Sequence, residues 1–211
     1  MALLEKALNI DFALFYSTIR NQQVSRFVQS GLGRMMVNAG RSRSYGLELG
    51  IKYAPTTTIQ AWANYGFTHA IFTRYDAGND TDYTGNRVPF IPKHTLNLGA
   101  DYVAYKSHNS FNGNEFTSAF RYPSLVKSVT LGASFGATGR IYWNESNTAS
   151  QALYTTLNAH ALIDFGCFTL NLWGSNLTNR HYQTFYFESM NRGYEQKGRP
   201  IQVGFDLKVL F

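Results

Sequence analysis

The stretch at residues 44–53, SYGLELGIKY, alternates apolar and polar side chains with a period of two. Tyr45, Leu47 and Leu49 fall on one set of positions, and Glu48 and Lys52 fall on the other. Successive side chains of a β-strand point to opposite sides of its sheet, so this alternation predicts a strand. One face of that strand is apolar and the other is polar.

The same alternation recurs along the chain and predicts seven further strands, at residues 8–17, 59–68, 95–102, 129–138, 156–165, 168–173 and 201–211. No segment shows the periodicity of a helix longer than a turn or two. With 211 residues, the chain is large enough to form one domain with a real core. We therefore expect an all-β fold, an antiparallel sheet of about eight strands.

The distribution of charge and aromatic residues indicates which face of this sheet meets which environment. Charged residues make up only 15% of the chain, against about 25% in ordinary soluble proteins. The strand charges all fall on the polar face, at Asp11, Glu48, Lys52, Asp101, Arg140, Asp164, Asp206 and Lys208. The apolar face instead carries aromatic residues toward its strand ends, at Tyr16, Tyr45, Tyr53, Tyr65, Phe67, Tyr102, Phe135, Phe165 and Phe211.

An uncharged face bordered by aromatic residues is typical of a transmembrane β-barrel, whose outer side contacts lipid. Lipid offers no hydrogen bonds, so a sheet that spans a membrane must pair its backbone groups internally. A soluble β-barrel binding protein would turn the apolar face inward, which explains the many glycines of the polar face less well. The single cysteine, Cys167, excludes an internal disulfide framework and a multi-cysteine zinc site. No run of Lys and Arg indicates binding to nucleic acid.

The connections between the predicted strands alternate in length. Long connections occupy residues 21–43, 73–93, 143–151 and 177–198, whereas 54–57 and 166–167 form short turns. Outer-membrane barrels place long loops outside the cell and short turns in the periplasm. Residues 105–127 break this rule, because that connection is long where a short one is expected; we predict an irregular hairpin at 116–120 within it.

Four segments resemble motifs of TonB-dependent outer-membrane receptors. Residues 38–49, NAGRSRSYGLEL, resemble the start of one family strand, and 86–95, NRVPFIPKHT, are similar to a segment that leads into another. Residues 172–182, LWGSNLTNRHY, are similar to the family's NLTD-type motif near the end of the barrel. The sequence Gly198-Arg199-Pro200, followed by a strand that ends in Phe211, resembles the family's C-terminus.

The resemblance implies active uptake of a scarce ligand across the cell outer membrane. Ligands of such receptors are ferric siderophores, haem, cobalamin or oligosaccharides, and a ferric siderophore is the one expected here. The family's barrel has roughly 22 strands around a plug domain, on which the TonB protein pulls. We expect residues 1–211 to be the C-terminal portion of such a barrel, since they show no plug, no TonB box and no signal peptide. TonB would then be a partner only through the missing plug.

The other expected partners are outer-membrane lipid and the barrel-insertion machinery, for which the resemblance makes Phe211 the assembly signal. Nucleic acid is not an expected partner. Two alternatives remain at this stage. An autonomous eight-stranded outer-membrane barrel would have a structural or adhesive role, because eight strands can close around their own side chains. A soluble β-barrel binding protein is the other.

The long loops hold the candidate ligand-binding residues, because loops on a rigid scaffold often carry recognition. Their aromatic side chains are predicted to stack on a ligand at the outer mouth, or else to pack the loops together: Tyr75, Tyr83, Trp143, Tyr154, Phe185, Tyr186 and Phe187. No catalytic residue, cofactor or metal site is predicted. Residues 132–136, GASFG, match the spacing of a hydrolase nucleophile motif but lie within a predicted strand. The histidines lack ligand spacing.

Overall fold

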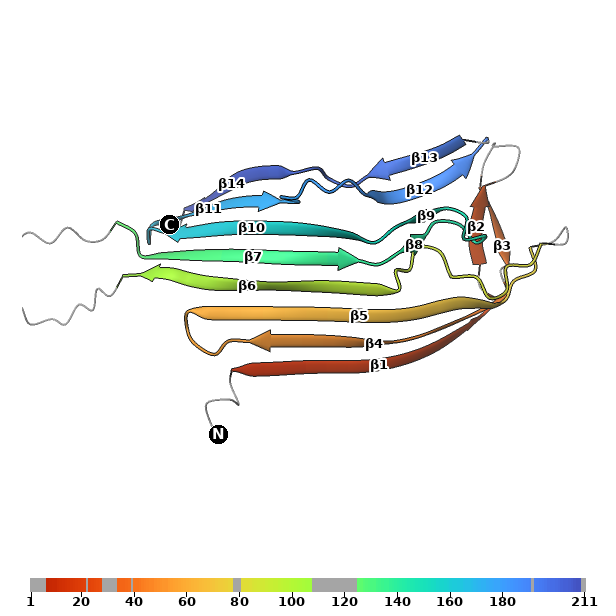
Figure 1. Cartoon of the computed structure of the whole chain (residues 1–211), viewed down its shortest axis with the longest axis horizontal. Helices are drawn as coiled ribbons and strands as arrows, with labels where there is room; N and C mark the ends of the chain where they lie inside the picture. The colour runs from red at the N-terminus through yellow and green to blue at the C-terminus, as the bar shows by residue number, and fades with distance from the viewer. Residues whose placement is uncertain are drawn as a thin grey trace, which may run out of the picture.

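The computed structural model describes residues 7–21, 23–27, 34–38, 40–77, 81–107, 125–190 and 192–209. Eight strands form one antiparallel sheet in the order β1-β4-β5-β6-β7-β10-β11-β14 (Figure 1). Their bounds are β1 (Leu8–Arg20), β4 (Arg41–Tyr53), β5 (Ile59–Arg74), β6 (His94–Lys106), β7 (Ser128–Thr138), β10 (Tyr154–Asp164), β11 (Phe168–Ser175) and β14 (Gln202–Val209). Each alternating segment of the sequence forms one of these strands, which confirms the predicted all-β fold.

Three small hairpins extend the long connections. They are β2 (Gln23–Phe27) with β3 (Arg34–Asn38), β8 (Ile141–Tyr142) with β9 (Ser150–Gln151), and β12 (Gln183–Ser189) with β13 (Arg192–Lys197). Figure 1 shows all three at the same end of the sheet, here called the long-loop end. The sequence pattern did not predict these short strands, which lie within the long connections that we expected to be loops.

The opposite end of the sheet carries the short turns. Gly166 and Cys167 form the predicted two-residue hairpin turn, closed by the Phe165 N–H, which donates to the Phe168 carbonyl at 2.9 Å. Gly166 has a φ of +87°, a conformation that glycine adopts without strain. Within the connection from β6 to β7, residues 108–124 lie outside the described part, and the predicted hairpin at 116–120 is among them.

The strand register keeps the apolar residues of all eight strands on one side, the apolar face. Leu47 of β4 pairs with Leu14 of β1 and with Phe67 of β5, and the same kind of pairing continues to β14. A register slip of one residue would mix the two faces, so the alternation specifies the pairing. The apolar face is uncovered: Leu14 is 71% exposed and Val203 is 76% exposed.

Glycines on the polar face make room for large rings on the neighbouring strand. A Cβ at Gly99 would lie 2.4 Å from the Trp62 ring, and one at Gly204 would lie 2.6 Å from the Trp173 ring. Real Cβ atoms do not approach so closely, so both positions require glycine while the indoles remain in place. The glycine-rich polar face is therefore a packed surface of flat rings and small residues.

The buried core of the described residues lies at the long-loop end. Phe72 and Tyr75 are almost completely buried, and Ala77, Tyr83 and Val88 pack against them. The rings of Phe72 and Tyr75 meet edge to face at 4.8 Å. This small core fixes the loop between β5 and β6 onto the end of its own strand.

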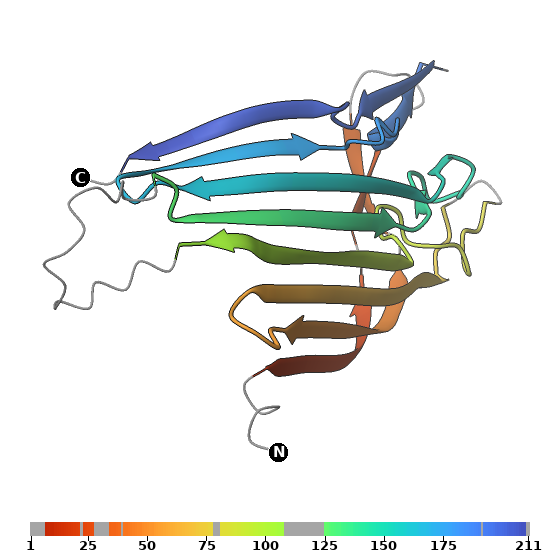
Figure 2. The same ribbon diagram turned by 60° about the vertical axis from the view of Figure 1, so that its left-hand side comes forward.

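The sheet is open. Among the described residues, β1 pairs only with β4 and β14 pairs only with β11, so the two edge strands do not meet. Figure 2 shows them at opposite edges of a curved sheet. An autonomous eight-stranded barrel would need β1 and β14 to pair. The open arc instead has the form expected for part of a larger barrel.

Candidate functional site

The polar face lines a hollow of about 850 Å³ along the inner side of the sheet. Its polar side chains come from β1, β4, β5, β6, β7 and β10, and include Asp11, Glu48, Lys52, Asn64, Asn97 and Thr156. This hollow is the position of the barrel lumen. The polar side chains of this hollow can form hydrogen bonds with water or with a polar protein domain, whereas the apolar side chains of the opposite face cannot.

A side-chain contact between His160 and Asp101 joins two strands on this polar face. His160 Nε2 of β10 lies 3.5 Å from Asp101 Oδ1 of β6, and both side chains lean over Gly132 of β7. Among the described residues, Glu48 and Lys52 form no ion pair. Those two charges are available to a partner that enters the lumen.

Aromatic rings from three long loops meet at the long-loop end and form what we call the ring cluster: Trp143, Phe90, Phe185, Phe187 and Tyr194. Phe90 is its centre, stacked on Phe185 with ring centroids 5.6 Å apart and tilted against Trp143 at 5.6 Å. Phe187 stacks on Tyr194 across the β12–β13 hairpin at 5.1 Å.

Three of the predicted ligand-binding residues, Trp143, Phe185 and Phe187, belong to the ring cluster. Sequence reasoning missed Phe90 and Tyr194. Phe90 lies in the 86–95 segment, whose sequence does not indicate a binding role for this residue. In the structure its ring is exposed and its φ is +66°. Its backbone N–H donates to the Tyr142 carbonyl at 2.9 Å, a contact between two loops that the sequence pattern does not show.

The other predicted residues lie elsewhere. Tyr75 is 1% exposed within the loop core, where Tyr83 packs edge to face against it at 5.3 Å. Tyr154 stacks on Tyr182 at 4.2 Å, at the start of β10. Tyr186 donates a hydrogen bond to Glu188 Oε1 at 3.0 Å, and desolvation together with this bond raises the pKa of Tyr186. The structure thus divides the predicted set into the ring cluster, the loop core and two separate contacts. Phe211 lies outside the described residues.

Asparagine side chains fasten the loops to one another. Asn147, with a φ of +59°, accepts a hydrogen bond from the Arg87 N–H at 2.7 Å and donates to the Arg87 carbonyl at 3.0 Å. Asn86 donates to the Glu145 carbonyl at 2.8 Å. The loop before β6 and the loop after β7 are therefore joined through backbone groups, which holds Phe90 and Trp143 in a fixed relation.

Asn176, directly after β11, has a buried side chain that makes three hydrogen bonds. It is 4% exposed and has a φ of +47°. Its amide donates to the carbonyls of Arg180 at 3.0 Å and of Arg199 at 2.9 Å, while its oxygen accepts from the Arg180 N–H at 2.9 Å. This side chain joins the loop after β11 to the segment that precedes β14.

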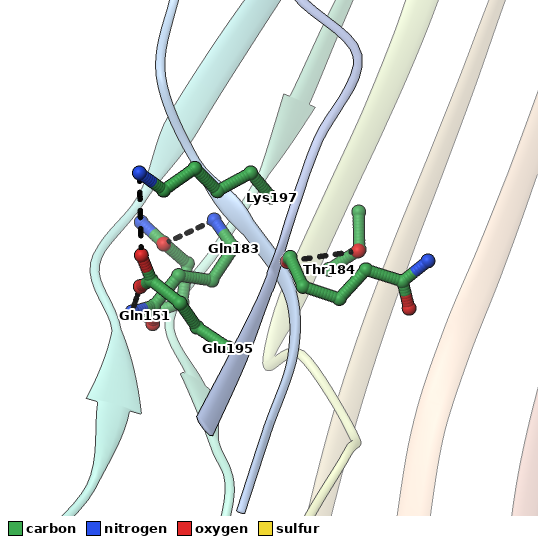
Figure 3. A network of polar contacts seen from close by, with 6 residues as sticks. Gln151, Gln183, Thr184, Glu195 and Lys197 are labelled. Atoms are coloured by element: carbon green, nitrogen blue, oxygen red, sulfur yellow. Dashed lines mark hydrogen bonds and ion pairs between the residues drawn. The ribbon is translucent and has the colours of Figure 1, made fainter. Parts of the chain in front are cut away.

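A second hollow, of about 570 Å³, lies beside the β12–β13 hairpin and is lined by Arg180, His181, Tyr182, Glu195 and Lys197, among others. Figure 3 shows its polar network. The Glu195 carboxylate accepts a hydrogen bond from the Gln183 amide and lies 3.5 Å from Lys197 Nζ. The bond from Gln183, followed by the charge of Lys197, lowers the pKa of Glu195.

The described residues contain no group of three or more His, Cys, Asp and Glu side chains placed to hold a metal ion. Ser134, the central residue of the GASFG stretch, lies within β7 and accepts a hydrogen bond from Asn158 at 3.3 Å. Within the described ranges, there is also no helix with the length and apolar character needed to cross a bilayer.

Comparisons with known proteins agree with this geometry. A family model for the TonB dependent receptor-like β-barrel matches residues 3–177. The ferrichrome outer membrane transporter/phage receptor of Escherichia coli (strain K12) is 28% identical over 141 residues, which are 67% of this chain and 16% of that protein. The pesticin receptor of Yersinia pestis is 26% identical over 207 residues, 94% of this chain and 26% of that receptor.

The crystal structure of the ferric yersiniabactin uptake receptor FyuA from Yersinia pestis has the same fold, with a TM-score of 0.74. The match covers 97% of this chain and 28% of that receptor, at 19% sequence identity. The chain thus spans between 16% and 28% of the lengths of these three proteins.

Proposed function

Because the chain belongs to the TonB-dependent receptor-like β-barrel family, we propose that residues 1–211 form the C-terminal part of the barrel wall of an outer-membrane receptor. The receptor takes up a scarce ligand actively, with energy delivered by the TonB protein through a plug domain. We propose a ferric siderophore as that ligand. The protein acts by binding and transport and not as an enzyme.

The observation that carries this proposal is the uncovered apolar face. Leu14, Leu98, Leu131 and Phe205 are exposed on one side of a sheet whose other side is polar and hollow. Soluble proteins rarely leave an apolar surface of this extent in water, whereas lipid covers it at no cost. The long loops, which gather at one end of the sheet, then form the outer mouth of the barrel.

The ring cluster supports the choice of ligand class. Its stacked faces can contact a flat or apolar part of a small molecule, and aromatic contacts of this kind contribute strongly to binding. The relatives described above bear names that include ferrichrome and ferric yersiniabactin, both of which are ferric siderophores. The receptor carrying this chain would select its ligand with the ring cluster and with the neighbouring β12–β13 hairpin.

Radiolabelled iron uptake tests the proposal. The full-length receptor that carries this chain is produced in bacteria that lack their own receptors, and iron is supplied as ferrichrome or as ferric yersiniabactin. We expect uptake of at least one of these complexes, and its loss in a strain without TonB. An outer-membrane location is checked by fractionation and by heat-modifiable migration in electrophoresis. Recovery of the protein in the soluble fraction, or uptake of both complexes that is independent of TonB, would refute the proposal.

A further inference from the structure

The side chain of Asn147 bonds to Arg87 in the way that the backbone of a neighbouring β-strand would. Its oxygen accepts from the Arg87 N–H at 2.7 Å, and its nitrogen donates to the Arg87 carbonyl at 3.0 Å. The same nitrogen donates to the carbonyl of Asn144 at 3.1 Å, within its own turn. One side chain therefore satisfies both backbone groups of a residue 60 positions away and keeps two loops at a fixed distance.

Each half of this junction is a short segment that leads to a ring of the ring cluster. On one side, Phe90 lies three residues after Arg87 and directly follows Pro89, whose pyrrolidine ring fixes its own φ. On the other side, Trp143 lies four residues before Asn147, at the start of the turn between β8 and β9. A shift of Asn147 relative to Arg87 would therefore move the indole relative to the Phe90 ring.

Asn144 makes the turn between β8 and β9 rigid. Its side-chain oxygen accepts from the Thr148 N–H at 3.0 Å and from the Ala149 N–H at 3.2 Å, and its nitrogen donates to Thr148 Oγ1 at 2.7 Å. The Trp143 N–H donates to the Ala149 carbonyl at 2.9 Å. Trp143 and the turn that contains Asn147 are thus one hydrogen-bonded unit.

Phe90 and Trp143 are both held in positions that cost free energy. Phe90 has a φ of +66°, which is uncommon for a bulky side chain. Trp143 is 6% exposed, and within the described part of the chain its buried Nε1 has no hydrogen-bond acceptor. A buried donor without an acceptor is costly, and strained positions persist only where the surrounding structure imposes them. The hydrogen bonds of Asn147 help to offset these costs.

We propose that Asn147 is a positioning residue for ligand binding, which holds Phe90 and Trp143 in the arrangement that the ligand contacts. This inference rests on the proposed function, because it requires the ligand to bind at the ring cluster. Rings that are already in place need not be ordered when the ligand arrives, which strengthens binding. Without the side chain of Asn147, Phe90 can return to a negative φ and the indole can reach water. Only a fraction of the molecules is then ready to bind, and the apparent Kd rises by the inverse of that fraction.

Ligand titration of the full-length receptor in detergent micelles tests the inference, with ferrichrome and ferric yersiniabactin as the probes. Asn147→Gly removes the side chain, and glycine accepts the φ of +59° at this position. We expect the Kd to rise about tenfold, as much as for removal of the Phe90 ring itself. Asn21→Gly is the matched control: Asn21 is exposed and has a φ of +54°, and this variant should bind like the wild type.

A double-mutant cycle shows whether Asn147 acts through Phe90. Asn147→Gly combined with Phe90→Ala should weaken binding about tenfold, little more than either change alone, because the ring to be positioned is gone. Acrylamide quenching gives a second signature that needs no ligand. The fluorescence of Trp143, taken as the difference from a Trp143→Phe variant, should be quenched more strongly in Asn147→Gly.

The outcomes separate the inference from the proposed function. An unchanged Kd in Asn147→Gly overturns the positioning role and leaves the receptor proposal standing. A loss of about a hundredfold in the double variant also overturns it, because the two effects are then independent. If the wild-type receptor binds neither complex, the proposed ligand class is wrong and the inference falls with it.

A second variant keeps the test decisive if Asn147→Gly does not fold. Asn86→Ala removes one hydrogen bond of the same junction, from the Asn86 amide to the Glu145 carbonyl at 2.8 Å. It should weaken binding about threefold, and this effect should disappear when Phe90 is already alanine. A threefold loss that persists in the Phe90→Ala background contradicts the positioning role.

Discussion

Substitution of Asn176 should weaken the rim of the barrel, because this side chain is both buried and fully hydrogen-bonded. Its side chain makes three hydrogen bonds, to the Arg180 carbonyl, the Arg180 N–H and the Arg199 carbonyl. Each contributes about 1 kcal/mol net, so their removal costs about 3 kcal/mol of the free energy of unfolding. The burial of Asn176 keeps water from replacing the lost partners.

Two variants at this position separate the side chain from the backbone. Asn176 has a φ of +47°, which glycine tolerates and alanine does not. Asn176→Gly should therefore lose about 3 kcal/mol, from the hydrogen bonds alone. Asn176→Ala should lose about 1 kcal/mol more of the free energy of unfolding, because alanine is strained in the left-handed backbone conformation at this position.

The assay is urea unfolding of the protein in detergent micelles, followed by tryptophan fluorescence and by the migration of unheated samples. Asn179→Gly is the matched control. Asn179 has the same φ of +47° but is exposed, and it accepts one hydrogen bond, from the Ile201 N–H at 3.1 Å. Its loss should cost about 1 kcal/mol or less. The reasoning fails if Asn176→Gly is as stable as the wild type, or no less stable than Asn179→Gly.

Three further predictions use the same protein. Gly99→Ala should lower the free energy of unfolding by about 1–3 kcal/mol, because the new Cβ meets an indole at 2.4 Å; Gly50→Ala, whose nearest neighbour lies at 3.4 Å, should be nearly neutral in the same urea assay. The protection of the β12–β13 amides against hydrogen exchange, measured relative to an unstructured peptide at the same pH, should fall as acid protonates Glu195. Because the pKa of Glu195 is lowered, the stabilisation is complete above the ordinary glutamate pKa of about 4.3 and is lost as the pH falls through the lowered pKa, and Glu195→Gln should abolish this pH dependence. Phe90→Ala removes the centre of the ring cluster and should reduce siderophore binding about tenfold, whereas Leu153→Ala, an exposed change outside the ring cluster, should not; equal effects of the two would contradict a binding role.

The strands could be predicted because their period is local. Leu47 and Leu49 show their common face within a few residues, and pairing simply repeats this pattern across the sheet. The ends of the strands were harder to predict from the sequence. β5 runs to Arg74, well beyond the predicted end at residue 68, because residues 69–74 continue to pair with β4 while His69 interrupts the apolar pattern.

The site was predictable only in part, for a different reason. Aromatic residues in long loops are visible in the sequence, but their partners depend on how separate loops dock. Phe90 contacts Phe185, which lies 95 positions later in the sequence. The loop that carries Phe90 is held to the loop after β7 by the hydrogen bond from the Arg87 N–H to Asn147. Tyr75 is also an aromatic residue of a long loop, but it is buried in the loop core. Residue type alone does not distinguish a ring of the ring cluster from a ring of the loop core.

The segments that resemble the receptor family have structural roles at the rim. Gly40 has a φ of +78°, and a Cβ there would lie 2.6 Å from the Arg74 carbonyl oxygen, so glycine is required where β4 begins. Asn86 fastens one loop to the next, and Asn176 fastens the loop after β11 to the segment before β14. Each holds the base of a loop and leaves its tip free to vary. We therefore expect Gly40, Asn86 and Asn176 to hold the loops in place whatever the ligand, and ligand selection to depend on the rings that these loops carry.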